Sequence, residues 1–156
     1  MPKVIVNSTP LISLIELDRL DILKVLYNEI IIPTAVYNEI SVKDKFTLPK
    51  YDWIKVKEIT NEVAKGAFTT ALHEGEVEVL ILAKEISADL VVIDDGLARK
   101  HAKYLDIKIT GTIGVLLKAK EKGIIKELKP YLDRLIENSF YISDDIYNEV
   151  LELTDE

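Results

Sequence analysis

The chain has 156 residues, a formal net charge of −7, 48% hydrophobic residues and no cysteine. The lack of cysteine excludes disulfides, thiolate zinc sites and cysteine nucleophiles. No apolar run approaches the roughly 18 residues that would span a bilayer, and the N-terminus lacks the pattern of a signal peptide. We therefore expect a soluble, cytoplasmic protein with one domain over residues 1–156 and no membrane association.

Short apolar runs alternate with helical periodicity along the chain. The first run, Val4–Val6, is β-branched and leads directly into Asn7, Ser8 and Thr9. We expect Thr9 to cap the following helix, with Pro10 at its first position. In chain order, the pattern predicts a strand at 4–6, helices at 10–17 and 20–27, a strand at 29–33, a helix at 34–40, a loop at 41–50, a strand at 53–59, a weak helix at 60–72, a helix at 73–86, a strand at 90–93, a helix at 96–105, a strand at 107–109, a turn at 110–114, helices at 115–122 and 128–138, a strand at 140–142 and a helix at 144–153.

Strands that alternate with helices favour parallel pairing, because each crossover helix returns the chain to the same edge of the sheet. The fully apolar strand at 90–93 is typical of a central parallel strand that is covered on both faces. We therefore predict a three-layer α/β/α sandwich with a mainly parallel central sheet.

Four positions carry polar or acidic residues where such a fold presents them, near the carboxyl ends of its strands. Asn7 ends the first strand, and Asp94 and Asp95 follow the most hydrophobic one. Glu76 lies in the first turn of the helix predicted at 73–86, and Glu39 lies late in the helix after the second strand. Carboxylates from separate elements repel one another unless a cation neutralises them, and Mg²⁺ prefers oxygen ligands. The pattern indicates a metal-binding pocket that acts on a phosphodiester.

Each of these side chains also has an ordinary structural explanation. Asp94 can cap the turn that follows it, and Asp95 can act as the cap or support a neighbour. Glu76 and the adjacent Glu78 can be first-turn acids that the helix dipole favours, and Glu39 can be a surface residue.

A basic block follows the acidic pair directly. Residues 96–129 contain nine basic and three acidic residues, whereas the overall net charge argues against indiscriminate nucleic-acid binding. The block can hold a polyanion near Asp94, or it can be a solvated helix face. Gly111 to Gly114 opens a helix, so its amides can hold a phosphate, with a tight turn as the alternative.

Five segments in this order resemble the PIN domain, the nuclease fold of VapC-type toxin ribonucleases and of PIN-like proteins of about this length. The segments are V-I-V-N-S-T-P-L-I, I-I-I-P-T-A-V-Y-N-E-I, H-E-G-E-V-E-V-L-I-L-A, A-D-L-V-V-I-D-D and I-T-G-T-I-G-V-L-L-K-A-K. The resemblance covers nearly the whole chain.

The resemblance implies cleavage of single-stranded RNA that depends on Mg²⁺ or Mn²⁺, commonly by a homodimer, and in toxins a small antitoxin protein as partner. It places the family's acidic site on Asn7, Glu39, Glu76 and Asp94, with Asp95 as a further metal ligand. It places Thr9 at the family's hydroxyl position. One departure stands out: the first-strand residue is the amide of Asn7, which keeps an oxygen but removes one negative charge.

Our leading hypothesis is a metal-dependent endoribonuclease of the PIN class, with the toxin of a toxin–antitoxin pair as its hypothesised role. Glu39, Glu76, Asp94 and Asp95 would hold the metal, with Asn7 completing the catalytic set. Substrate positioning is assigned to Thr9 and Thr112, and contacts to the RNA backbone to Arg99, Lys100 and Lys103. The alternative is a PIN-fold module, weakened by Asn7, that binds RNA or a protein partner without turnover.

Overall fold

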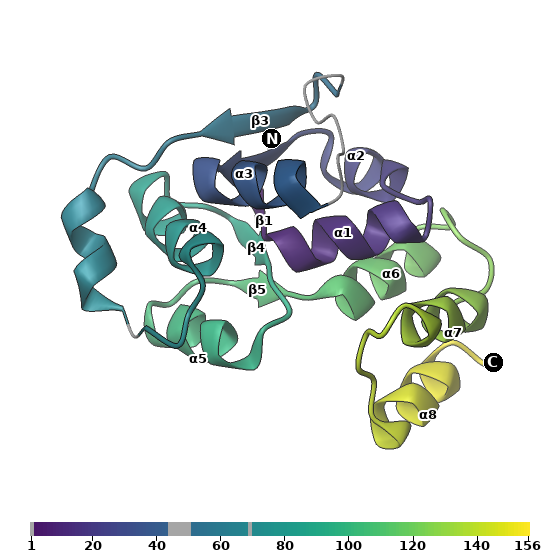
Figure 1. Ribbon diagram of the computed structural model, residues 1–156. Coiled ribbons are helices and arrows are strands. Elements are labelled where there is room, and N and C mark those ends of the chain that lie inside the picture. Colours follow the sequence, from purple (N-terminus) through teal and green to yellow (C-terminus); the bar gives the residue numbers. More distant parts are fainter. Residues whose placement is uncertain (1, 44–50, 69) are drawn as a thin grey trace.

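Five short parallel strands form the centre of the computed structural model, which describes residues 2–43, 51–68 and 70–156. Their order across the sheet is β3-β2-β1-β4-β5, and each pairs in parallel with its neighbours (Figure 1). The strands are β1 (Val4–Val6), β2 (Ile30–Pro33), β3 (Ile54–Lys57), β4 (Leu90–Val92) and β5 (Ile109–Thr110). The predicted parallel sheet is confirmed.

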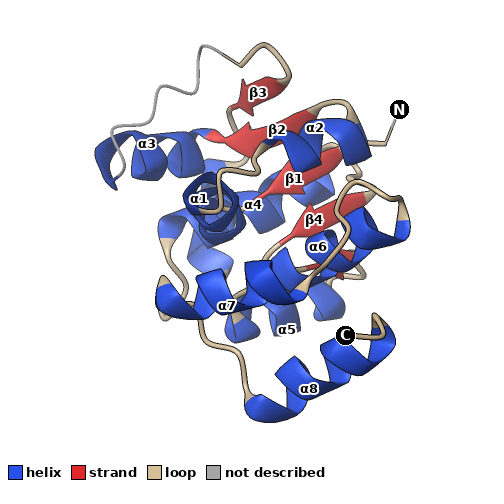
Figure 2. Ribbon diagram, turned by 90° about the vertical axis from the view of Figure 1, so that its right-hand side faces the viewer, coloured by secondary structure: helices blue, strands red, loops and turns tan. Residues whose placement is uncertain are grey.

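Helices cover both faces of this sheet, as the prediction of a three-layer sandwich requires. Figure 2 views the sheet from the side of α2 and α6, with α4 on the far side. Helix α3 contacts both α1 and α4, so it connects the two helical layers. The helices are α1 (Ser8–Glu16), α2 (Asp21–Tyr27), α3 (Thr34–Lys43), the 3-10 helix η2 (Glu62–Ala67), α4 (Glu74–Glu85), α5 (Gly96–Tyr104), α6 (Thr112–Glu121), α7 (Lys129–Glu137) and α8 (Asp144–Leu153).

The helix α4 is the most deeply buried of these elements, and every residue from Gly75 to Ala83 is buried. It packs against β1, β2, α3, α5 and η2. Its apolar residues point in most directions around the helix axis, which is the pattern of a core helix rather than of a surface helix. Two buried acids, Glu76 and Glu78, interrupt this apolar surface near its start.

The order of the strands changes direction at the pair β1 and β4. From β1 the chain moves through β2 to β3 on one side, and it then crosses to β4 and β5 on the other. In open parallel sheets, ligands bind outside the carboxyl ends of the strands at such a switch point. Asn7 follows β1 and Asp94 follows β4 at this place, with Val6 paired to Val92.

Three local predictions are wrong. Helix α1 begins at Ser8 with Asn7 as its N-cap, so Thr9 lies inside the first turn instead of capping it. The strand predicted at 107–109 is β5, Ile109–Thr110, because Thr110 pairs with Val92. Helix α6 starts at Thr112, so the turn predicted at 110–114 is shorter than expected. Residues 140–142 form an irregular connection between α7 and α8, where Phe140 and Ile142 pack against the core without strand pairing.

Other boundaries agree with the prediction to within a few residues. The weak helix predicted at 60–72 is the short 3-10 helix η2, and α8 is capped by Ser143, whose Oγ accepts from the backbone N of Ile146. Helix α3 continues to residue 43 into the predicted loop, and residues 44–50 of that loop lie outside the described residues. Within the described part of the chain, none of the helices combines the length and apolar character that crossing a bilayer demands.

Candidate active site

Asn7 lies buried at the carboxyl end of β1, with 2% of its surface exposed. Its backbone N–H donates to the carbonyl of Val92 over 2.9 Å, which ties the end of β1 to β4. Although Asn7 is the N-cap of α1, its side chain makes no capping hydrogen bond, and its Oδ1 is buried without a hydrogen-bond partner. Such an unpaired buried acceptor costs about 1–3 kcal/mol, so its presence calls for an explanation.

The first turn of α4 faces this amide through Gly75. A Cβ on Gly75 would lie 3.8 Å from Asn7 Oδ1 and 3.1 Å from Glu39 Oε2. The Oγ of Ser8 donates to the same Glu39 oxygen over 2.9 Å. The absent side chain of Gly75 therefore leaves room for an amide oxygen from β1 and a carboxylate from α3 to meet beside the start of α4.

Glu76, the next residue of α4, faces the end of β4. Its Oε1 accepts from the backbone N–H of His73 over 3.0 Å, which completes a capping box at the start of the helix. Burial raises the pKa of Glu76, and the negative charge of Asp95 and a hydrogen bond with it raise the pKa further. The buried Glu76 carboxylate therefore lies beside the exposed Asp95. Asp95 also caps α5 by accepting from the backbone N of Ala98 over 2.9 Å.

Asp94 is held by the start of α6. Its Oδ1 accepts from the backbone N of Thr112 over 2.8 Å, and its Oδ2 accepts from Thr112 Oγ1 over 2.6 Å. Burial raises the pKa of Asp94, and the Thr112 hydrogen bonds and the charge of Arg99 oppose that rise. Asp94 is itself the anion at this helix N-terminus, so the Thr112 amide in the Gly111–Gly114 turn is already occupied.

The residues predicted to contact substrate lie in different environments. Thr112 is fully buried and uses both of its donors on Asp94, so it orients this carboxylate. Arg99 turns toward the same place, where its guanidinium donates to the carbonyl of Ile93 over 3.2 Å. Lys100, Lys103 and Thr9 are exposed at the surface.

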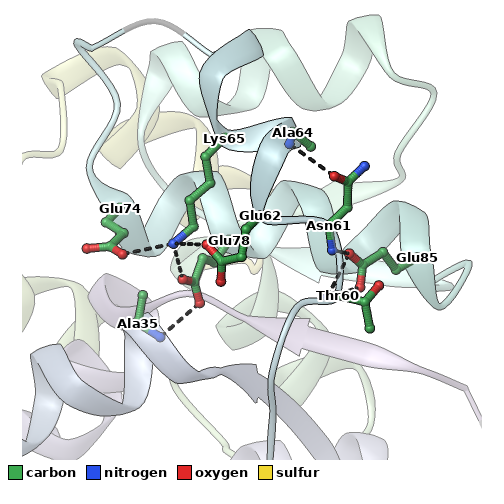
Figure 3. A network of polar contacts seen from close by, with 9 residues as sticks. All are labelled: Ala35, Thr60, Asn61, Glu62, Ala64, Lys65, Glu74, Glu78 and Glu85. Atoms are coloured by element: carbon green, nitrogen blue, oxygen red, sulfur yellow. Dashed lines mark hydrogen bonds and ion pairs between the residues drawn. The ribbon is translucent and has the colours of Figure 1, made fainter.

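A lysine that the sequence pattern did not single out lies at the centre of a second acidic cluster. Figure 3 shows the Lys65 ammonium between three carboxylates, 2.8 Å from Glu78, 3.0 Å from Glu74 and 3.1 Å from Glu62. Hydrogen bonds with Glu78 first, and then with Glu74 and Glu62, raise the pKa of Lys65. Glu78 also accepts from the backbone N of Ala35 over 3.0 Å, at the start of α3.

Lys65 and Glu78 line a cavity of about 580 Å³ together with Glu39, His73 and Gly75. Glu39 and Gly75 also border the Asn7 amide, so this cavity opens beside the candidate site. Glu78 is already neutralised by Lys65, whereas the Glu76–Asp95 pair has a like-charged contact. This contrast favours Glu76 over Glu78 as the α4 member of the site.

Comparison with known families agrees with this arrangement. A family model described as a PIN domain matches residues 3–156. The chain belongs to the PIN-domain family. No curated protein matches the chain significantly.

Membership in this family indicates the general type of chemistry. The family fold points to nuclease-type chemistry, to nucleic acid as the ligand and to a divalent metal ion as the usual cofactor. The polar groups of this chain that meet at the switch point come from β1, α3, α4 and the end of β4. These are the elements that the resemblance assigns to the site.

The donor set of this PIN domain suits a divalent cation in its chemistry. It consists of amide and carboxylate oxygens, which Mg²⁺ and Mn²⁺ prefer, and it includes the unpaired Oδ1 of Asn7. The space left at Gly75 adjoins both Asn7 and Glu39. In residues 2–43, 51–68 and 70–156, no three acidic or histidine side chains are close enough to form a ready-made metal cage. The donor chemistry of these oxygens suits a divalent ion, although the acidic side chains of the described residues do not form a preassembled cage.

Proposed function

We propose that this PIN domain is a metal-dependent endoribonuclease that cleaves phosphodiester bonds of single-stranded RNA. The observation that carries the proposal is the buried, unpartnered Oδ1 of Asn7, which faces the first turn of α4 at the switch point of the sheet. An acceptor kept in this state is explained if it binds a cation together with its neighbours.

Asn7, Glu39, Glu76, Asp94 and Asp95 would hold the ion. Held by these residues, a divalent cation would supply polarisation of a phosphoryl oxygen and activation of water at neutral pH. The chain supplies no cysteine, and the Ser8 hydroxyl near the site donates to Glu39. Attack by water therefore suits this site better than a covalent mechanism.

The remaining residues of the site orient these ligands and the substrate. Thr112 fixes both oxygens of Asp94, and Arg99 places a positive charge beside the same carboxylate. In our proposal, Lys100 and Lys103 bind the RNA backbone from the exposed surface of α5, and Thr9 positions the substrate at the start of α1.

Replacement of Asp94 tests this proposal. We expect purified protein to cleave single-stranded RNA with Mg²⁺ or Mn²⁺ and to lose that activity in EDTA or in Asp94→Asn, because the amide removes charge and one acceptor. Asp144→Asn, on the exposed start of α8, is the matched control and should retain cleavage. RNA cleavage that survives both EDTA and Asp94→Asn would refute the assignment.

A second candidate function is a PIN module that binds RNA or a protein partner without turnover. Two observations favour it: the first-strand residue is an amide, and the described acids form no close cluster of three. Titration calorimetry with Mn²⁺ separates the two functions, because the module predicts no saturable binding near millimolar concentration.

Our proposal extends to the biological setting of the nuclease. We propose that it acts as a homodimer in the cytoplasm and as the toxin of a pair, held inactive by a small antitoxin protein. Exposed Ile146 and Leu153 of α8 offer apolar side chains for such contacts. Sedimentation velocity of the purified chain tests the dimer, and a monomer at all concentrations would contradict it.

A further inference from the structure

A second cavity, of about 560 Å³, lies along α5 on the side of η2. Phe68, at the end of η2, forms one wall, and Leu97, Lys100, His101 and Tyr104 of α5 form the other. We call these five residues the α5 groove. Its volume lies within the range of about 300–1,000 Å³ that is usual for ligand sites.

The α5 wall of this groove is one face of the helix. Leu97, Lys100 or His101, and Tyr104 are separated by three or four residues, so their side chains line up along the axis. From residue 97 to residue 104 the helix rises about 10 Å, which matches roughly three nucleotides stacked at about 3.4 Å.

Three rings line the groove: Phe68 and His101 are half-buried, and Tyr104 is open to solvent. Phe68 and His101 lie in ring contact, with their centroids 5.8 Å apart. Tyr104 is 91% exposed, which is unusual for a large ring beside an apolar cavity. Flat faces that remain exposed next to a cation are the features on which unpaired bases stack.

The positive charge around the groove favours an anionic ligand. Lys100 lines it, and Lys103 and Arg99 belong to the same helix, within a segment that holds nine basic and three acidic residues over 96–129. Lysine is depleted in the cores of protein–protein interfaces, whereas cations beside aromatic rings are typical of surfaces that bind single strands. A polyanion with stacking bases therefore fits this groove better than a peptide.

The groove begins close to the candidate active site. Leu97 lies two residues after Asp95, in the first turn of α5. A strand whose scissile phosphate lay near Asp94 and Asp95 would meet the groove within a short distance.

We propose that the α5 groove is a substrate subsite in which bases of single-stranded RNA stack on Tyr104, His101 and Phe68 while Lys100 contacts the backbone. This inference rests on the proposed function, since it assigns part of the substrate path of that nuclease. It assigns recognition of unpaired bases to a surface separate from the metal-binding carboxylates.

The test uses a short single-stranded RNA that carries 2-aminopurine, whose fluorescence is quenched when the base stacks. The oligonucleotide is titrated with the 156-residue protein in EDTA, and again in Mg²⁺ with the signal recorded before cleavage. Variants are Tyr104→Ala, Tyr104→Phe and, as a matched control, Tyr141→Ala, which removes a tyrosine that is 85% exposed outside the groove. Circular dichroism checks that each variant folds.

We expect the wild-type protein, Tyr104→Phe and Tyr141→Ala to quench the probe equally. Tyr104→Ala should weaken binding by roughly 5- to 150-fold, the loss that removal of one base–aromatic stack produces. Equal quenching by Tyr104→Ala, or no quenching by the wild-type protein in either buffer, would overturn the inference. A change of oligomeric state in Tyr104→Ala with unchanged RNA binding would assign the groove to a protein contact and overturn it too.

Comparison of RNA binding with RNA cleavage distinguishes failure of the nuclease proposal from failure of the groove inference. If the wild-type protein quenches the probe but never cleaves RNA with Mg²⁺ or Mn²⁺, the groove stands as an RNA-binding surface while the catalytic proposal falls. If cleavage depends on metal and on Asp94 but not on Tyr104, the nuclease stands and the groove inference falls.

Discussion

Gly111 shows how closely the groups around Asp94 approach one another. A Cβ at this residue would lie 2.6 Å from Asp94 Oδ1 and 2.9 Å from the Nη1 of Arg99. The backbone of Gly111 is extended, so space and not conformation excludes a side chain here. Glycine thus lets the start of α6 come near enough for Thr112 to hold both oxygens of Asp94.

We predict that Gly111→Ala displaces the Asp94 carboxylate and lowers RNA cleavage by up to about 100-fold, since small misplacements of catalytic groups have effects of that size. Gly96→Ala is the control, because a Cβ there would meet no atom within 4 Å. Steady-state cleavage rates of the two variants provide the measurement. Equal rates would show that the position of Asp94 does not limit the reaction.

At this scale, the sequence was informative wherever a polar residue followed an apolar strand or opened a helix. Asn7, Asp94, Asp95 and Glu76 were predicted in this way, and the structure places them after β1, after β4 and in the first turn of α4. Their role in a site stays a prediction. Lys65 was not predicted, because its partners Glu74 and Glu78 belong to another element and only the tertiary fold brings them together. The contact of Phe68 with His101 was not predicted either, because the two residues also belong to different elements.

At the scale of elements, polar contacts tie the segment that contains η2 to α4 at both of its ends. None of the residues Glu62–Ala67 is buried. The Glu85 carboxylate accepts from the backbone N of Thr60 and Asn61 at one end of the segment, and Lys65 binds Glu74 and Glu78 at the other (Figure 3). Elements fixed by few apolar contacts open more readily than the core.

We predict that Lys65→Met loosens this segment. The change leaves the buried Glu78 carboxylate without its cation, which should cost about 1–3 kcal/mol of unfolding free energy. Hydrogen exchange at residues 60–68 should accelerate, while exchange in α4 changes less. Lys55→Met, at an exposed lysine on β3, provides the control. Unchanged protection of 60–68 in Lys65→Met would show that other contacts fix the segment.

Element boundaries could be predicted where periodicity is strong, as in α4 and α8. They could not be predicted at β5, because its position is set by pairing of Thr110 with Val92 and not by its own short pattern. Residues 140–142 have the composition of a strand, yet Phe140 and Ile142 pack against the core without strand pairing and Tyr141 is exposed. Long-range pairing therefore decided the cases in which local composition failed.

At the scale of the whole molecule, the C-terminal end of the described chain returns to the sandwich through Glu156. Its carboxylate accepts from the backbone N of Leu128 and Lys129 and lies 2.9 Å from the Lys120 ammonium. This contact anchors the end of α8 to α6 and to the start of α7. Helix α8, which lies outside the candidate site, is thereby fixed to the helices that cover the sheet.

This anchor predicts a dependence of stability on pH. Burial alone would raise the pKa of Glu156, but the hydrogen bonds from Lys129, Lys120 and Leu128 outweigh it and lower the pKa from 4.5 to about 2. Because the folded-state pKa is depressed, the stabilisation is complete above about pH 4.5 and is lost as the pH falls toward 2. Thermal unfolding of Glu156→Gln should therefore show a lower melting temperature at neutral pH and a weaker pH dependence in that window. Parallel curves for Glu156→Gln and the wild-type protein would contradict the prediction.

The central claim is that the oxygens around the first turn of α4 bind a divalent cation for RNA cleavage, with Asn7 as the weakest ligand. Titration calorimetry with Mn²⁺, combined with RNA cleavage, on the wild-type protein and Asn7→Asp tests this claim directly. We predict saturable Mn²⁺ binding that is tighter in Asn7→Asp, together with faster cleavage, because the change restores a negative charge at the site. Absence of saturable binding in both folded proteins, with no gain in cleavage, would contradict the claim.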